Sequence, residues 1–269
     1  MEYAFITISG TDRHTFLQGQ LTQDLDRLAA ERTLPAAWCD PQGRVTVTAR
    51  LFDAGERIVM AVPSSALDAT LKRLTLYRLR ADVGIDTETA WTARAYADGP
   101  GADPDSRADP VTTVRHGSGF VEAFGPADAF DDAEPDALDA ASWAVARIAA
   151  GLVDIGAENA GKYTPHMLNL DRTGAVSFSK GCYTGQEIVA RTENLGRVKR
   201  RINRYRTTQP PDGPLRIGDR LTCRDDAVGE IVNASGRELL ALVPIDRHGE
   251  TLAVGGTTAA PLPLPYSLD

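Results

Sequence analysis

Cys182 is the residue of this chain whose type and position best suit covalent chemistry. It lies in a glycine-rich run, Ser-Lys-Gly-Cys-Tyr-Thr-Gly-Gln-Glu, over residues 179–187. The thiolate is the reactive form of cysteine, and a nearby cation or the N-terminus of a helix favours it. Lys180 stands two residues before Cys182. Two interpretations follow: a reactive thiol, or a small buried cysteine beside a capped helix, since free cysteines are often core residues.

The run that holds Cys182 is expected to lead from a strand over 176–178 into a helix over about 185–195. Thr184 and Glu187 have the spacing of a capping box, in which each side chain bonds to the backbone of the other residue. Gly196 follows as a natural stop for the helix. The apolar stripe of this helix consists of Ile188, Val189, Thr192 and Leu195.

The last eight residues of this run, KGCYTGQE over 180–187, resemble the signature of the YgfZ family. YgfZ proteins are folate-binding relatives of the T-protein of glycine cleavage, and they are linked to iron–sulfur enzyme maintenance and tRNA modification. The likeness extends from residue 3 to the end of the chain and is strongest at 16–24, 37–44 and 179–191. Besides Cys182 and Lys180, the matched motif contains Gly181, Tyr183, Gly185, Gln186, Glu187 and Arg191.

The resemblance also implies a folate site formed by Tyr3 and Trp143. Tyr3 stands where YgfZ proteins have a tryptophan, and Trp143 matches their second tryptophan, so the two rings are expected to flank the pterin of tetrahydrofolate or a derivative. An aromatic ring of this size can stack on a flat heterocycle. From the residues alone, Tyr3 would be a half-buried strand residue and Trp143 a core residue.

Carboxylates that the relatives carry are missing at two places in this chain. The T-protein has an aspartate required for aminomethyl transfer where this chain has Val47 and Thr48, and the family has an acidic residue where this chain has Ala149. Aminomethyl transfer needs a group that handles protons near the folate nitrogen. The sequence therefore does not predict aminomethyltransferase activity, and whether the protein is an enzyme at all stays open.

The order of predicted elements indicates an α+β protein. The resemblance implies the T-protein fold, with three subdomains around a central cavity. The expected strands and hairpins include 3–8, 45–52 with 57–62, 229–234 and 239–243, and the expected helices include 138–150. Tyr77 to Ile85 is expected to be strand-like, and the acidic stretch 97–141 to be partly loop, with short strands at 111–115 and 119–124. The predicted subdomains are 1–44 with 137–200, an inserted 45–136, and a C-terminal β-barrel over 201–269.

Composition narrows the class of protein. The net charge of −8 over 269 residues argues against a broad nucleic-acid surface. The three cysteines lie far apart with no ligand spacing around them, so no metal is expected to be held by this chain alone, and a reducing cytoplasm fits. Neither a signal peptide nor a membrane span is predicted.

One basic cluster interrupts this acidic chain after the predicted central helix. It consists of Arg191, Arg197, Lys199, Arg200, Arg201, Arg204 and Arg206, against Glu193 alone. Such a cluster could meet a folate glutamate tail, an acidic protein or RNA, or could be a solvated strand edge. No RNA-binding fingerprint accompanies it, so direct RNA binding has little support. His166 could be a proton-handling group, or an ordinary histidine that is solvated or satisfied by its neighbours.

Three functions remain from the sequence. The first is a folate-binding accessory protein, with iron–sulfur enzymes or assembly proteins as partners and tRNA modification as the downstream process. The second is a folate-dependent one-carbon transferase or demethylase. The third is a docking scaffold whose cavity is vestigial and whose basic cluster, with Arg200 and Arg201, binds a partner.

Overall fold

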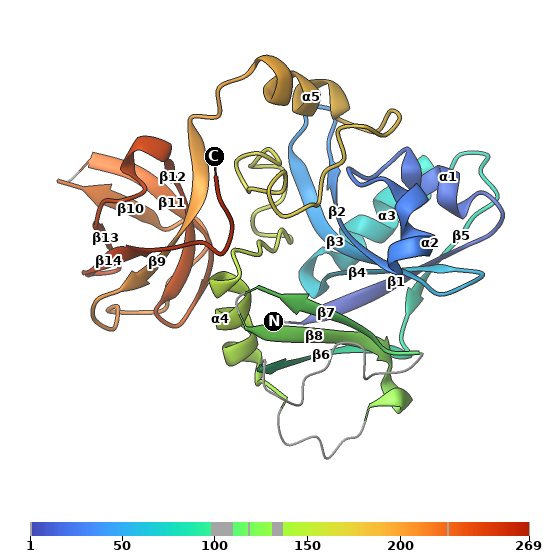
Figure 1. The fold of residues 1–269 in the computed structure, drawn as a ribbon, viewed down its shortest axis with the longest axis horizontal. Coiled ribbons are helices and arrows are strands. Elements are labelled where there is room, and N and C mark those ends of the chain that lie inside the picture. Colours follow the sequence, from blue (N-terminus) through green and yellow to red (C-terminus); the bar gives the residue numbers. More distant parts are fainter. Residues whose placement is uncertain (1, 98–109, 118, 131–136, 225, 269) are drawn as a thin grey trace.

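The first sheet has five antiparallel strands and is covered on both faces. The computed structural model describes residues 2–97, 110–117, 119–130, 137–224 and 226–268. The strand order is β2-β3-β4-β1-β5 (Figure 1). Their bounds are β1 Tyr3–Ser9, β2 Thr33–Cys39, β3 Val45–Asp53, β4 Ile58–Pro63 and β5 Gly84–Glu88.

Alternation of side chains along β1 explains the two covered faces, because successive residues of a strand point to opposite sides. Ile6 and Ile8 pack in one core with Leu17, Leu21 and Leu74, on the face covered by three helices. These helices are α1 Arg13–Gln18, α2 Leu28–Glu31 and α3 Leu67–Tyr77. Phe5 and Phe52 point to the other face and pack with Phe124 and Trp91 of a second sheet.

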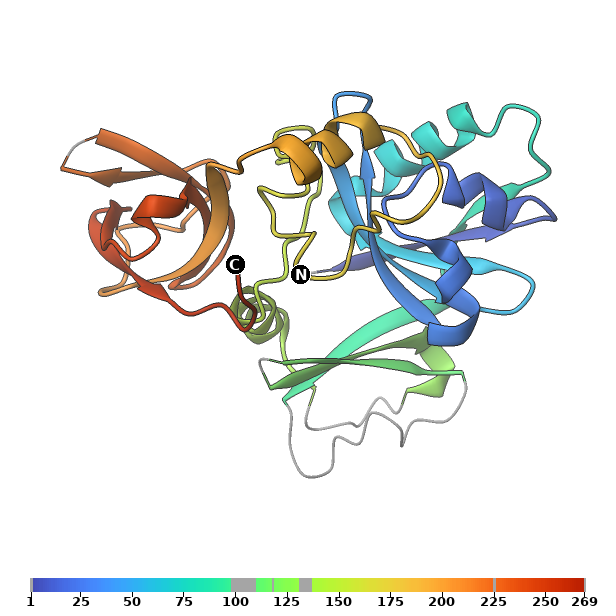
Figure 2. The same ribbon diagram turned by 45° about the horizontal axis from the view of Figure 1, so that its top comes forward.

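The second sheet has three strands in the order β6-β8-β7. The strands are β6 Trp91–Ala97, β7 Thr112–His116 and β8 Phe120–Pro126, and α4 Ala140–Ala149 follows them in the chain. Figure 2 shows this sheet below the first one. The short strands predicted at 111–115 and 119–124 are thus confirmed, whereas 98–109 and 131–136 of the acidic stretch lie outside the described residues.

The C-terminal quarter of the chain forms a closed six-stranded barrel in the order β10-β11-β12-β9-β14-β13. The strands are β9 Arg200–Thr207, β10 Arg220–Cys223, β11 Asp226–Ser235, β12 Glu238–Pro244, β13 Leu252–Val254 and β14 Thr257–Leu262. The helix α5 Gln186–Leu195 precedes it. Short 3-10 helices occur at Leu25–Arg27, Ser64–Ala66, Ala127–Ala129 and Ile245–Arg247. The predicted α+β class and the barrel are confirmed.

Between α4 and α5 the chain runs as a strap without helix or strand, although every residue from 150 to 185 is described. We call residues 152–185 the strap. It is held to the loop after α1 and to the first sheet, because Thr22 Oγ1 donates to the Ala175 carbonyl at 2.6 Å and the Val45 N–H of β3 donates to the Tyr163 carbonyl at 2.7 Å. The strand predicted over 176–178 is therefore wrong: the Ser177 N–H donates at 2.9 Å to Thr22 instead of to a strand partner.

One other detail differs from the sequence-based expectations. Tyr77 ends α3 and the next strand begins only at Gly84, so the strand-like reading of 77–85 is wrong over most of its length. The subdomain boundary after residue 44 stays a prediction; β2 and β3, on its two sides, form seven residue pairs from Thr33–Phe52 to Cys39–Val45. Within the described residues, no helix is long and apolar enough to span a membrane.

Candidate functional site

The Cys182 run docks on the turn between β2 and β3, and two glycines make this possible. Gly185 has φ +83°, and a Cβ there would lie 2.4 Å from the Asp40 carbonyl oxygen. Gly43 has φ +70°, and a Cβ there would lie 2.8 Å from Cβ of Ile188 in α5. Only glycine combines the left-handed conformation with this close approach. The motifs at 37–44 and 179–191, distant in sequence, therefore form one contact surface.

The helix predicted over about 185–195 is confirmed, but its predicted capping box is wrong. α5 begins at Gln186, its N-cap is Gly185, and no side chain caps it. The Gln186 side chain instead turns back, and its Oε1 accepts from the Tyr183 N–H at 3.3 Å. The left-handed conformation of Gly185 therefore directs the chain into α5, in place of the predicted threonine cap.

Lys180 is a structural tie for the Cys182 run. Its Nζ donates to the carbonyl oxygens of Gln18, Leu21 and Gln23 at 2.7, 2.8 and 2.7 Å, which uses all three ammonium hydrogens. Burial lowers the pKa of Lys180 to about 8. The ammonium thus holds the loop after α1 against the strap, and its hydrogen bonds point to that loop, not to the thiol.

Lys180→Met should lower the free energy of unfolding by about 2–3 kcal/mol, because it leaves three carbonyls without their charged donor. Urea denaturation at pH 7 measures the change. Lys162→Met, at another lysine of the strap, is the control and should change stability by less than about 0.5 kcal/mol. Equal stabilities of the two variants would show that the three hydrogen bonds of Lys180 do not stabilise the fold.

Cys182 is exposed, whereas Cys39 is buried and Cys223 is intermediate. The interpretation of Cys182 as a buried core cysteine is therefore wrong. Burial raises the pKa of Cys39 to about 12, so that thiol is protonated and inert at neutral pH. Exposed apolar side chains occur just before this run and on α5: Phe178, Ile188 and Leu195. Cys182 is therefore the most exposed of the three cysteines.

A cavity of about 250 Å³ lies where the first sheet, the second sheet, α4 and the strap meet. Ligand cavities usually start at roughly 300 Å³, so this one suits a small ring system better than a whole extended ligand. The lining residues that carry polar or aromatic groups are Tyr3, Thr48, Arg50, Arg115, His116, Arg147, Asp154 and Thr173. The predicted central cavity thus has a polar wall.

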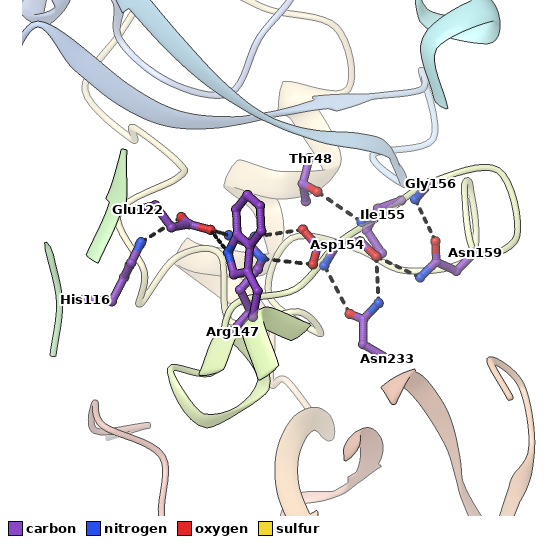
Figure 3. Close-up of polar contacts among 10 residues, drawn as sticks. Thr48, His116, Glu122, Arg147, Asp154, Ile155, Gly156, Asn159 and Asn233 are labelled. Atoms are coloured by element: carbon purple, nitrogen blue, oxygen red, sulfur yellow. Dashed lines mark hydrogen bonds and ion pairs between the residues drawn. The ribbon is translucent and has the colours of Figure 1, made fainter. Parts of the chain in front are cut away.

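Arg147 is the centre of a buried charge network on that wall (Figure 3). Its Nη1 donates to Glu122 at 2.6 Å, and its Nε and Nη2 donate to the two oxygens of Asp154 at 3.1 and 2.7 Å. Glu122 also accepts from Trp143 Nε1 at 2.7 Å and lies 2.8 Å from His116 Nε2. The network connects β7, β8, α4 and the strap.

The barrel is attached to the same network through Asn233 of β11. Asn233 Oδ1 accepts from the Asp154 N–H at 3.1 Å, and its Nδ2 donates to the Asp154 carbonyl at 3.0 Å (Figure 3). Asn159 Nδ2 donates to the same carbonyl at 3.0 Å. Residues of α4, of the strap and of the barrel therefore all bond to Asp154.

Tyr3 and Trp143 lie side by side. Their ring centroids are 5.7 Å apart with an interplanar angle of 53°, and the Arg147 guanidinium lies 5.5 Å over the Tyr3 ring. Tyr3 lines the cavity, and Trp143 is not among its lining residues. A ligand in the cavity would therefore touch Tyr3, while Trp143 supports Tyr3 and Glu122 from behind.

The two positions that lack the relatives' carboxylates have distinct surroundings. Thr48 lines the cavity, and its Oγ1 accepts from the Ile155 N–H at 3.0 Å, so it ties the strap to β3. Ala149 does not line the cavity, whereas Asp154, five residues later, does. The cavity wall thus has a carboxylate that the sequence reasoning did not select.

The Arg147 network was missed because its members come from four elements with no common spacing. A local signal did exist: Arg147 interrupts the most apolar helical stretch of the chain, and Glu122 interrupts the apolar run Phe-Val-Glu-Ala-Phe of β8. A charged residue at a core position must be paired, so two such residues predict each other as partners.

Several side chains of the basic cluster form ion pairs within the protein. Arg201 is buried and forms a two-pronged ion pair with Asp171, with bonds of 2.9 and 2.8 Å. Arg204 and Arg206 both pair with Glu238. Arg201 therefore cannot serve as the exposed docking residue of the scaffold hypothesis.

His166 belongs to this buried region as well. Its Nε2 lies 3.0 Å from Glu193 Oε2 of α5, and the ring is almost fully buried. His166, Asp171 and Glu193 have ligand atoms within 4.8 Å of one another, a spacing that a metal ion could use. Both oxygens of Asp171, however, already accept from Arg201.

The fold is that of an aminomethyltransferase of the T-protein type. The crystal structure of glycine cleavage system aminomethyltransferase T from Bartonella henselae superposes with a TM-score of 0.72 over 99% of this chain and 83% of that protein, at 16% identity. That low identity supports the fold alone. No protein-family model matches the chain.

Sequence relatives define the family. The chain is 30% identical to the tRNA-modifying protein YgfZ of Enterobacter sp. (strain 638), over all of this chain and 92% of that protein. It is 32% identical to the tRNA-modifying protein YgfZ of Serratia proteamaculans (strain 568), over 75% of this chain and 68% of that protein. The chain belongs to the YgfZ family.

Proposed function

We propose that this protein is a folate-binding accessory protein that supports assembly or repair of iron–sulfur enzymes, and through them tRNA modification. The observation that carries the proposal is the polar-walled cavity with Tyr3 on one side and the Arg147 network on another. Relatives named tRNA-modifying proteins support the downstream process. The cytoplasm is the compartment where such a protein would act.

The cavity residues fit the pterin ring of a folate. Tyr3 offers an aromatic face, and Asp154 and Arg50 offer an acceptor and a donor for the ring's polar edge. The volume of about 250 Å³ is large enough for a bicyclic ring. Tetrahydrofolate or a derivative is therefore the proposed ligand, and no step of chemistry is assigned to it.

Cys182 is proposed as the site that reacts with or engages the partner enzyme. It is exposed on a loop fixed by Lys180 on one side and Gly185 on the other, so the thiol is presented on a rigid support. Lys180, Gly181, Tyr183, Gln186, Glu187 and Arg191 belong to this proposed site as its supporting motif.

A folate-dependent one-carbon transferase or demethylase is the second candidate. The shared aminomethyltransferase fold favours it. Against it, neither Val47 nor Thr48 is a carboxylate: Val47 is buried in the core, and the Thr48 hydroxyl on the cavity wall accepts from the Ile155 N–H of the strap. Release of methylenetetrahydrofolate from an amine donor would establish this alternative.

Calorimetric titration with tetrahydrofolate under anaerobic conditions tests the folate proposal. We expect binding to the wild-type protein and a loss of at least about tenfold in Trp143→Ala, because Tyr3 and Glu122 lose their support. Trp91→Ala is the control, since Trp91 packs on Phe5 and Phe52 and does not line the cavity. Absence of binding to the wild-type protein would remove the folate proposal.

Cys182→Ser should fold like the wild-type protein and should fail to restore iron–sulfur enzyme activity in a strain that lacks the gene. Cys223→Ser is the control, because that cysteine lies in the barrel. Thermal melting checks folding, and tRNA thiolation is the second readout. Full restoration of activity by Cys182→Ser would eliminate the thiol's role.

A further inference from the structure

A groove of about 530 Å³ lies at one end of the barrel, and among the described residues its lining shares none with that of the central cavity. We call it the arginine groove; its lining residues are Arg200, Arg220, Arg247, Pro244 and all of 226–230. Strand register explains why the arginines meet. Arg200 of β9 lies opposite Pro244, the last residue of β12, and Arg247 follows in the next short helix. Arg220 of β10 lies opposite Glu230 of β11.

Arg200 brings a charge into the arginine groove that no carboxylate among the described residues neutralises. It is half-buried, and its Nη2 donates to the Val228 and Leu242 carbonyls at 3.4 and 3.2 Å. Its Nε is buried and has no hydrogen-bond partner in the described parts of the chain. Carbonyl oxygens satisfy N–H groups but leave the positive charge of a guanidinium in place. A partly buried cation of this kind favours an anion beside it.

Arg220 and Arg247 keep donors free as well. Arg220 is exposed and forms neither a hydrogen bond nor an ion pair with the residues that the structure describes. Arg247 forms a loose ion pair of 3.6 Å with Glu250, which is not a lining residue of the groove as described. A guanidinium has five N–H donors. The groove therefore offers donors from three elements to a ligand that accepts hydrogen bonds in several directions.

Two carboxylates of the lining limit the attraction for an anion. Asp226 is the exposed first residue of β11. Glu230 is half-buried and lies near Tyr163 of the strap, since burial and then the Glu230 charge raise the pKa of that hydroxyl. The lining thus carries three positive and two negative charges. Because the net charge favours an anion only modestly, the geometry of the donors must supply the rest.

We propose that the arginine groove binds a phosphate group, carried by the RNA backbone or by a free nucleotide. Planar guanidinium forks match pairs of phosphate oxygens. A phosphate has oxygens in several directions, so arginines from three elements can bond to it at once. Contacts to phosphate read no base, and they require none of the RNA-binding fingerprints that this sequence lacks. The site goes beyond the proposed folate function and does not depend on it.

Two probes test the proposal: a fluorescein-labelled tRNA transcript, followed by fluorescence anisotropy, and adenosine triphosphate, followed by calorimetry. Arg220→Gln and Arg247→Gln should each weaken binding roughly five- to tenfold at about 0.1 M salt, because each removes one phosphate contact. For the tRNA probe, each should also reduce the slope of log affinity against log salt by about 1. Arg216→Gln is the matched control, at an exposed arginine that does not line the groove, and should change neither quantity.

Asp226→Asn should have the opposite effect. It removes a negative charge from the wall of the groove, so both probes should bind roughly two- to fivefold more tightly. Asp128→Asn changes the net charge of the protein by the same amount at an exposed position in the short helix Ala127–Ala129. It should leave binding unchanged. A general effect of net charge would appear in both variants, so the difference between them locates the phosphate at the groove.

The outcomes decide both the proposal and the source of the phosphate. Binding of tRNA without binding of adenosine triphosphate would assign the groove to RNA, and binding of adenosine triphosphate with the same variant effects would admit a free nucleotide. Binding of neither probe, or affinities that Arg220→Gln and Arg247→Gln leave unchanged, would overturn the proposal. Thermal melting checks the fold of each variant, which should be retained because both arginines are at least partly exposed. Failure of tetrahydrofolate to bind would leave this inference standing.

Discussion

Gly185→Ala is expected to lower the free energy of unfolding by about 3 kcal/mol or more. The left-handed conformation at φ +83° alone costs a residue with a side chain about 1–2 kcal/mol. The added methyl would also lie 2.4 Å from the Asp40 carbonyl oxygen and 3.0 Å from Cβ of Cys39. Cys39 is the buried last residue of β2 and Asp40 begins the β2–β3 turn, so neither has room to move and the strap and the turn must separate.

Gly181→Ala is the matched control in the same motif. A Cβ at Gly181 would meet nothing within 4 Å, and its backbone is not in the left-handed region. Urea denaturation of the two variants measures the difference, and limited proteolysis of the strap should be faster only in Gly185→Ala. Equal stabilities would show that the docking of the motif on the turn contributes nothing.

Glu122→Gln is expected to lower the free energy of unfolding by about 3–5 kcal/mol, the range for breaking a buried charge pair. Glu122 is fully buried and bonds to Arg147, Trp143 and His116. A glutamine has the same shape and can keep these hydrogen bonds, but it removes the negative charge and leaves the buried Arg147 with Asp154 as its only charged partner in the network. Glu250→Gln is the control, because Glu250 belongs to an exposed pair with Arg247 at 3.6 Å.

The effect of Glu122→Gln should depend on pH. Burial alone would raise the pKa of Glu122, but the Arg147 charge and the His116 hydrogen bond together hold it well below its usual range. A depressed pKa contributes stability that is full above the unfolded value of about 4.3 and is lost as pH falls below it. The stability difference between wild type and variant should therefore be largest near pH 7 and smaller at pH 3. A constant difference would contradict the network.

Local patterns in the sequence predicted much of the fold. The hairpin of β3 and β4, the helix α5 and the barrel strands β11 and β12 follow from periodicity and turn residues, which act over a few neighbours. The strand predicted over 176–178 failed because its hydrogen-bond partner, Thr22, lies about 150 residues earlier, beyond the reach of any local pattern.

The candidate site was predictable only where one short segment contains it. Cys182 was found from its own surroundings, and the structure places it on the surface. Lys180 was predicted to be its charge partner, but in the structure the Lys180 ammonium donates to three carbonyls of residues 18–23. Asp154 and Arg50 were missed, because the cavity brings together a strap residue and a strand residue whose roles no spacing reveals.

The strap's contacts also bear on the order of folding. Lys180 bonds to carbonyls that lie about 160 positions earlier in the chain, at residues 18–23. Thr22 bonds to the Ala175 carbonyl, 153 positions later. Contacts with such long sequence separation form late, because the loop-closure entropy must be overcome first. The first sheet must exist before residues 18–23 and the β2–β3 turn can receive the Cys182 run. Presentation of the thiol is therefore coupled to completion of the tertiary structure, and a partly folded chain would not present Cys182 in this setting.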